Sequence, residues 1–190
     1  MRKLFAHTVE ALLFPFVNFY ITIKWGGYWN MKKAFPNFYS KKALAMSWRY
    51  YFERKNSDIS PSTYIVGIPC FPHGEFGVFI SRNAVIGENA VIFQQVTIGS
   101  NTLKGSNCGS PIIGSNCYIG AGAKIVGNVV IGDNCRIGAN ACVYKDMPDN
   151  SVAVCSPTRI ITKNTILDNR FFSVDGLVFD FETGKYVLSK

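Results

Sequence analysis

Two side chains suited to proton transfer, His73 and Asp58, lie fifteen residues apart in the chain. An imidazole titrates near neutral pH, so it can take a proton from a hydroxyl group and return it to a leaving group. A carboxylate on one ring nitrogen would fix the tautomer and orient the ring, which leaves the other nitrogen as the base. We therefore interpret His73 as a candidate catalytic base and Asp58 as its orienting acid.

Metal chemistry is not expected. The chain has only two histidines, His7 and His73, whereas a zinc site of the carbonic anhydrase type needs three imidazole ligands. The six cysteines show no paired spacing and no CxxC motif, which favours a reducing cytoplasm over a disulfide framework. Cys117 and Cys135 are expected to be packed inside the fold.

The elements that must position these residues follow an unusual period. Aliphatic residues recur every six positions from Ile80 to Ile98 and again from Ile113 to Val143, and the fifth place of each hexad is small or slender. A helix has a period near 3.6 and a strand a period of 2, so a period of six indicates a solenoid. Three short strands per coil of about 18 residues would place every aliphatic residue inside a prism.

The period fails in two places, and such failures are where functional sites are expected. The step from Phe71 to Ile80 is nine residues and contains His73. The step from Ile98 to Ile113 is fifteen residues and contains the sequence LKGSNCGSP, a loop that should project from a corner.

The hexads in residues 58–163 resemble those of the hexapeptide-repeat acyltransferase family. The order DISP, HGEFG and QQVTIG is similar to serine O-acetyltransferases and to relatives that acetylate sugars of bacterial surface polysaccharides. The resemblance implies an all-β main domain built as a left-handed parallel β-helix. It also implies direct transfer of the acetyl group of acetyl-CoA, with His73 as base and Asp58 as orienting acid.

The resemblance further implies where the coenzyme binds. The CoA arm of the family lies along a late corner of the solenoid, which corresponds here to Ala121 and Ala139, with Lys145 and Arg159 as partners of the phosphates. Such enzymes are usually homotrimers with sites between subunits. The loop at 104–111 would then contact a neighbouring subunit.

The acceptor is predicted from what the site lacks. Serine acetyltransferases place an acidic residue before the catalytic histidine and an Arg-His pair before a later proline. The equivalents here are Pro72 and Gly109-Ser110. We therefore expect a sugar or glycan hydroxyl as acceptor, with serine as the alternative and a non-catalytic scaffold as the second alternative.

The amino-terminal segment differs in composition from the rest. Residues 1–55 hold ten of the 20 Lys/Arg, two of the 12 Asp/Glu and 15 of the 27 aromatic residues. We expect helices broken at Pro15 and Pro36, which cap the first coil. The composition also suits peripheral contact with an anionic membrane, whereas no nucleic-acid-binding motif accompanies the charge. The apolar run is too short to span a bilayer.

Three regions are predicted: a basic, aromatic-rich helical cap at residues 1–57, the β-helix at 58–163 and a carboxyl-terminal hairpin at 164–190. The hairpin is expected around Asp175-Gly176, between two alternating runs. The expected location is the cytoplasm, at the inner face of the membrane if the basic segment binds lipid.

Overall fold

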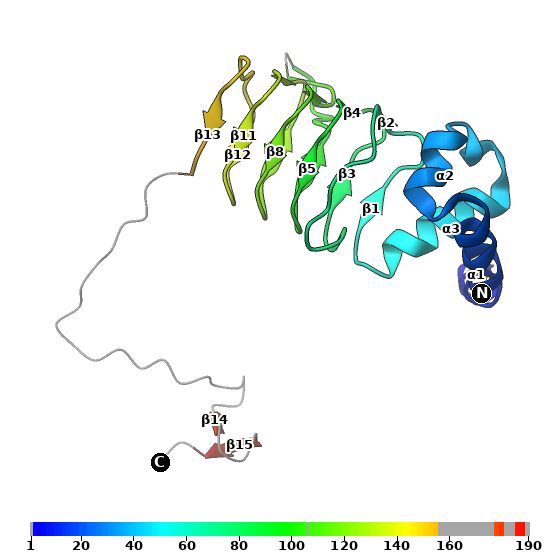
Figure 1. Cartoon of the computed structure of the whole chain (residues 1–190). Helices are drawn as coiled ribbons and strands as arrows, with labels where there is room; N and C mark the ends of the chain where they lie inside the picture. Colours follow the sequence, from blue (N-terminus) through cyan, green and yellow to red (C-terminus); the bar gives the residue numbers. More distant parts are fainter. Residues whose placement is uncertain (1, 106, 156–176, 181–184, 189–190) are drawn as a thin grey trace. The chain divides into compact units, whose positions relative to one another are not determined.

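The computed structural model describes residues 2–105, 107–155, 177–180 and 185–188 (Figure 1). The chain divides into two compact units, residues 1–155 and 156–190. The first unit begins with the helices α1 (Arg2–Trp25), α2 (Tyr28–Ala34), η1 (Phe38–Ser40) and α3 (Lys42–Glu53). The predicted boundary at residue 163 lies outside the described residues.

Short parallel strands follow the helices and form a left-handed β-helix (Figure 1). They make three sheets, in the orders β1-β3-β6-β9-β12, β2-β4-β7-β10 and β5-β8-β11-β13, named here sheets A, B and C. The strands are β1 (Asp58–Ile59), β2 (Tyr64–Ile65), β3 (Phe79–Ile80), β4 (Val85–Ile86), β5 (Val91–Ile92), β6 (Thr97–Gly99), β7 (Ile112–Ile113), β8 (Tyr118–Ile119), β9 (Lys124–Val126), β10 (Val130–Ile131), β11 (Arg136–Ile137), β12 (Cys142–Val143) and β13 (Val152–Ala153).

The predicted period is confirmed by strand pairing. Phe79 pairs with Thr97 and Tyr118 with Arg136, each 18 positions on. The aliphatic residues of the period are buried from Ile80 to Ile98 and from Ile113 to Val143. The small fifth residues within the coils are buried beside them: Ala90, Val96, Cys117, Ala123, Val129, Cys135 and Ala141. Cys117 and Cys135 are buried as expected, and burial raises the pKa of the Cys117 thiol.

Corners between sheets need a left-handed backbone. Asparagine supplies it at several equivalent corner positions, with φ between 55 and 59° at Asn89, Asn116, Asn134, Asn140 and Asn150. Asparagine tolerates this conformation better than other residues that carry a side chain. The sequence pattern therefore encodes both the prism interior and its turns.

The amino-terminal helices cover the first coil. Trp48 is fully buried and its indole Nε1 donates to the carbonyl of Ile59, 2.6 Å away. The prediction that Pro15 breaks a helix is wrong, because Pro15 lies inside the 24-residue helix α1. The neighbouring Phe14 ring lies 4.7 Å from that of Tyr50 on α3, so packing between the helices offsets the lost backbone hydrogen bond. Pro36 does separate α2 from η1.

No helix in the described part of the chain has the length and apolar character needed to cross a bilayer. In the second unit, β14 (Leu177–Asp180) pairs antiparallel with β15 (Lys185–Leu188). Asp180 pairs with Lys185 in this register. The hairpin expected around Asp175-Gly176 falls on residues that lie outside the described part.

Candidate active site

His73 lies on the irregular corner that precedes β3. Its ring is exposed and stands edge-on to Phe93, with the ring centroids 5.5 Å apart. Nδ1 lies 3.0 Å from Oε1 of Gln94. An amide oxygen can only accept, so in the neutral ring this contact requires the proton on Nδ1, which leaves the lone pair on Nε2. The ring is thus held in the tautomer that a general base requires.

Sequence reasoning missed Gln94 as a partner of His73. The residue belongs to the QQVTIG motif and lies 21 positions after His73, which is one coil plus the three extra residues of the irregular corner. Counting one coil plus the three inserted residues onward from His73 would have identified Gln94 as its neighbour.

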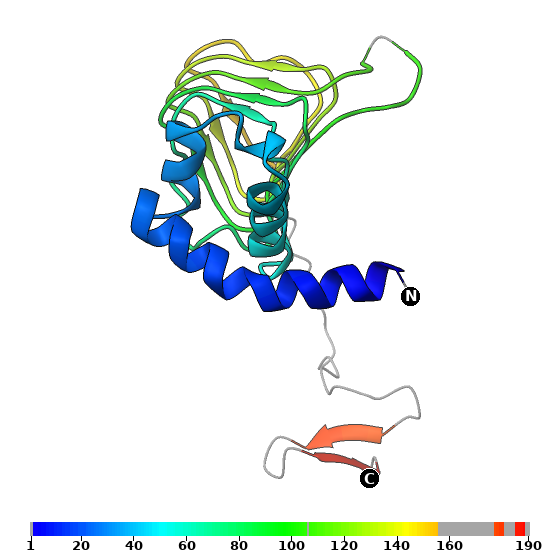
Figure 2. The ribbon, with the colours of Figure 1, turned by 90° about the vertical axis from the view of Figure 1, so that its right-hand side faces the viewer.

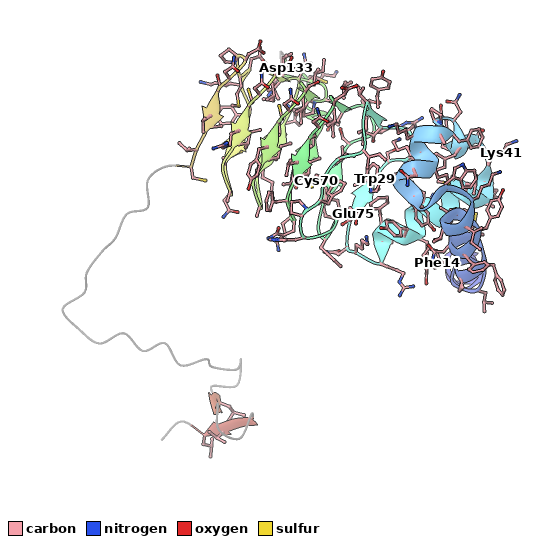
Figure 3. The ribbon with its side chains drawn as sticks, viewed as in Figure 1. Phe14, Trp29, Lys41, Cys70, Glu75 and Asp133 are labelled. Carbon is pink, nitrogen blue, oxygen red and sulfur yellow. The ribbon has the colours of Figure 1, made fainter. Side chains whose placement is uncertain are left out.

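Glu75 holds this corner against the helices. Its buried carboxylate accepts a hydrogen bond from Trp29 Nε1 at 2.8 Å and forms an ion pair with Lys55, and the two labelled side chains Trp29 and Glu75 lie where helices and coils meet (Figure 3). Burial alone would raise the pKa of Glu75, but the hydrogen bonds from Lys55 and Trp29 hold it below its ordinary value. The hydroxyl of Ser57 donates to the Glu75 carbonyl. The helical segment therefore fixes the backbone two residues from His73.

Asp58 begins β1, where its side chain is exposed and pairs in register with Phe79. It lines a hollow of about 590 Å³ together with Arg49, Glu53 and Arg82. No hydrogen bond joins Asp58 to His73, although both residues are described. The structure thus gives His73 a different partner, and the predicted role of Asp58 remains a proposal.

Ala121 and Ala139 lie on the corner between sheets C and A, the same corner that carries His73 and Gln94. The Gly122 amide donates to the Gln94 carbonyl at 3.0 Å, and the Asn140 amide donates to the Ala121 carbonyl at 2.8 Å. Successive coils are thereby stacked through their backbones. The corner residues His73, Gln94, Ala121 and Ala139 form one continuous line, named here the His73 ridge.

Of the two predicted phosphate partners, the structure describes only Lys145, and it lies away from this ridge. Lys145 is exposed after β12, on the next corner, with Nζ 5.8 Å from the centroid of the Tyr144 ring. Arg159 lies outside the described residues.

The second break in the repeat is a loop that leaves the coil after Gly99. Asn101 and Gly109 pair across its base, and Ser100 bonds to Ser110 at 2.6 Å. Thr102, which occupies the small fifth place of the hexad that begins at Ile98, is exposed on this loop, as is Cys108. This loop and Lys145 extend from the same corner, between sheets A and B.

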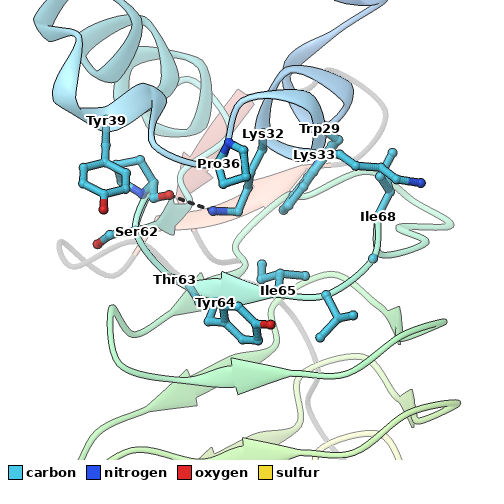
Figure 4. Close-up of a pocket in the computed structure, with 13 residues that line it drawn as sticks. Trp29, Lys32, Lys33, Pro36, Tyr39, Ser62, Thr63, Tyr64, Ile65 and Ile68 are labelled. Carbon is cyan, nitrogen blue, oxygen red and sulfur yellow. Dashed lines mark hydrogen bonds between the residues drawn. The ribbon is translucent and has the colours of Figure 1, made fainter.

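A separate hollow of about 260 Å³ lies between α2 and the first coil (Figure 4). Lys32 lines it and donates from Nζ to the Pro61 carbonyl at 2.7 Å. Burial lowers the pKa of Lys32 to about 8. The Trp48 ring lies 5.5 Å from the same ammonium. These contacts give Lys32 a role in joining the helices to the coil.

Comparisons with known proteins agree with this fold. Residues 110–145 match the family model of the bacterial transferase hexapeptide (six repeats). Serine acetyltransferase 5 of Arabidopsis thaliana is 44% identical over 119 residues, which cover 59% of this chain and 37% of that protein. Serine acetyltransferase of Synechococcus elongatus is 40% identical over 94 residues, which cover 50% and 38%. This chain thus spans well under half the length of these relatives.

Solved structures that are similar to this chain are serine acetyltransferases as well. Serine acetyltransferase of Neisseria gonorrhoeae in complex with serine has a TM-score of 0.54 at 30% identity, covering 64% of this chain and 48% of that one. A serine acetyltransferase in complex with CoA has a TM-score of 0.56 at 28% identity, covering 70% and 53%. The resemblance to hexapeptide-repeat acyltransferases and the left-handed β-helix are confirmed.

The predicted sugar or glycan acceptor is contradicted, because the similar proteins are serine acetyltransferases. The prediction assumed that Pro72 and Ser110 leave the site without charged groups. That reasoning considered only residues adjacent to the motifs. Charged side chains from elements distant in sequence, Arg49 on α3 and Arg82 after β3, line the hollow beside Asp58.

Proposed function

We propose that this protein is an acetyl-CoA-dependent O-acetyltransferase that acts on the hydroxyl group of serine. The observation that carries the proposal is the free Nε2 of His73 on a ridge of small residues. The similarity to serine acetyltransferases supports the same donor and acceptor.

The chemistry is a direct transfer. Nε2 of His73 removes the hydroxyl proton as the serine oxygen attacks the acetyl carbonyl carbon. A new O–C bond forms, the C–S bond breaks, and the imidazolium returns the proton to the departing thiolate. The products are the acetyl ester of serine and free CoA. The amide oxygen of Gln94 keeps the ring oriented and accepts a hydrogen bond from the Nδ1 proton throughout.

The coenzyme is proposed to lie along the His73 ridge. Ala121 and Ala139 present little side chain there, so an extended arm could approach the coil backbone. The tight stacking of the coils keeps the ridge narrow: a Cβ added at Gly120 would lie 2.7 Å from the amide nitrogen of Ala139. Lys145, which reaches from the neighbouring corner, and Arg159 are proposed to contact the phosphates at one end of the arm.

The acceptor proposal uses the hollow beside Asp58. Serine carries a carboxylate and an ammonium group, and the hollow offers Arg49 and Arg82 together with Glu53. Charges of both signs suit such a ligand. We further propose that Asp58 stabilises the His73 imidazolium through its negative charge, as its place in the DISP motif implies.

A homotrimer is also proposed. The outward side chains of sheet B form an apolar ladder in which Tyr64, Ile112 and Val130 are 65%, 45% and 48% exposed. Contiguous exposed apolar surface of this kind commonly marks an interface. Light scattering of the purified chain tests this, and a monomer mass would contradict it.

The test of function follows CoA thiol release from acetyl-CoA in the presence of L-serine. We expect release to depend on serine, and His73→Ala to lower turnover at least about 100-fold with an unchanged circular dichroism spectrum. His7→Ala is the matched control, since it removes the other imidazole, and should retain turnover. Equal rates for His73→Ala and the unaltered protein would support a non-catalytic scaffold instead.

A further inference from the structure

One face of α1 carries an exposed apolar stripe. Leu12, Phe16, Phe19 and Ile23 are spaced by four, three and four residues, and they are 67%, 75%, 67% and 70% exposed. This spacing places all four on one side of a helix. The stripe therefore runs along the helix as a continuous line of large side chains in contact with solvent.

The opposite face of α1 is already used for folding. Ile21 is fully buried, Phe14 and Val17 pack against the core, and the Phe14 ring contacts Tyr50 of α3. In Figure 2, α1 runs along one side of the helical segment and its amino-terminal part extends past the other helices. A helix that is apolar on both faces is normally covered on both. The stripe is thus fixed in position by one face and left without cover on the other.

Positive charge and aromatic rings lie beside the carboxyl-terminal end of the stripe. Nζ of Lys24 lies 4.6 Å from the Trp25 ring centroid and hydrogen-bonds to the hydroxyl of Tyr20 at 3.0 Å. Residues 1–55 as a whole hold ten Lys/Arg and two Asp/Glu. Basic and aromatic side chains beside an apolar stripe suit the headgroup region of a bilayer with anionic lipids.

We propose that α1 lies in the plane of an anionic membrane surface, with Leu12, Phe16, Phe19 and Ile23 inserted at the boundary of headgroups and acyl chains. A second copy of the chain is a poorer cover, because it would bring the same excess of positive charge against this one. The proposal is independent of the acetyltransferase activity.

The test is co-sedimentation of the full chain with phosphatidylcholine vesicles that contain or lack phosphatidylserine. We expect binding to the anionic vesicles that weakens with added salt. Phe16→Ser/Phe19→Ser should weaken binding at least about tenfold, since each buried aromatic side chain contributes appreciably. Leu103→Ser/Val154→Ser is the matched control, because Leu103 on the projecting loop and Val154 after β13 are 74% and 75% exposed and lie away from α1. It should bind like the unaltered chain.

Three results would overturn the proposal. The unaltered chain could remain in solution with anionic vesicles. The α1 double variant could bind as tightly as the control double variant. Finally, the α1 double variant could have a smaller mass in solution than the unaltered chain and the control double variant. That result would show that a second copy of the chain covers the stripe. Both double variants should release CoA thiol at the same rate. A loss of vesicle binding can then be distinguished from a loss of the proposed activity.

Discussion

The two parts of the His73 ridge are held in different ways. At its far end, Ala121 and Ala139 are stacked by a backbone hydrogen bond between coils, from the Asn140 amide to the Ala121 carbonyl. At the near end, the corner of His73 depends on the side chain of Glu75 and its partners in the helical segment. We therefore expect the Ala121–Ala139 end, where coenzyme binding is proposed, to tolerate distant changes. The His73 end, where proton transfer is proposed, should respond to changes in the helices.

The largest effect is expected from Glu75→Ala. Removal of the carboxylate leaves Lys55 and the Trp29 indole without their partner, which should lower the free energy of unfolding by about 2–3 kcal/mol. Turnover should fall by roughly tenfold or more, since small displacements of a base are costly. Urea titration and thiol release measure the two effects.

Glu88→Ala is the control for this change, because Glu88 is an exposed carboxylate on the coils. It should alter stability by less than about 0.5 kcal/mol. Similar losses in both variants would mean that Glu75 has no special role in holding the corner.

A smaller effect is expected at the backbone-held end. A Cβ at Gly120 would lie 2.7 Å from the Ala139 nitrogen, and this contact is with backbone. Gly120→Ala should therefore push the coils apart, cost about 2 kcal/mol and weaken acetyl-CoA binding while the proton transfer itself is kept. Isothermal titration with CoA and thermal unfolding check both parts.

Gly99→Ala is the matched change, since Gly99 has the same place in its hexad. Its added Cβ would meet only ordinary contacts, at 3.6 Å and beyond. If Gly99→Ala proves as damaging as Gly120→Ala, close stacking at the ridge is not the cause.

Next in size is the hydrogen bond between His73 and Gln94. Gln94→Leu removes the acceptor for Nδ1, and the loss of about 0.5–1.5 kcal/mol corresponds to a roughly two- to tenfold fall in kcat/KM. Gln94→Glu should restore orientation and place a negative charge beside the imidazole, which favours its protonated form. The pH dependence of kcat/KM should then shift upward, and an unchanged profile would argue against the contact.

A separate, pH-dependent effect on stability concerns Lys32, another side chain that joins helices to coil. Burial lowers its pKa in the folded protein to about 8 from an ordinary value of 10.5. The unfolded chain therefore binds more protons between these values, so stability should rise with pH across this window. Guanidinium titrations from pH 8 to pH 10 should show this rise in the unaltered protein and lack it in Lys32→Met.

The repeat made the β-helix predictable because each hexad encodes its own strand and corner. Their positions in the six-residue period are enough to assign Ile119 and Cys117 to the interior, where both are buried. The partner of His73 was not predictable in this way, since Gln94 comes close only when coils stack around a corner with three extra residues. The predicted helix break at Pro15 was wrong because packing of α1 on α3 offsets the unfavourable effect of proline inside a helix. Arg49 and Arg82 are distant in the sequence and line the same hollow only in the folded chain.

The contrast between the two ends of the ridge is tested most directly by amide hydrogen exchange in the unaltered protein and in Glu75→Ala. The Gly77 amide donates to the Lys55 carbonyl, and the Asn140 amide donates to the Ala121 carbonyl. We predict faster exchange in residues 74–78 of the variant and unchanged exchange in residues 138–141. Equal acceleration at both corners, or none at either, would contradict the account.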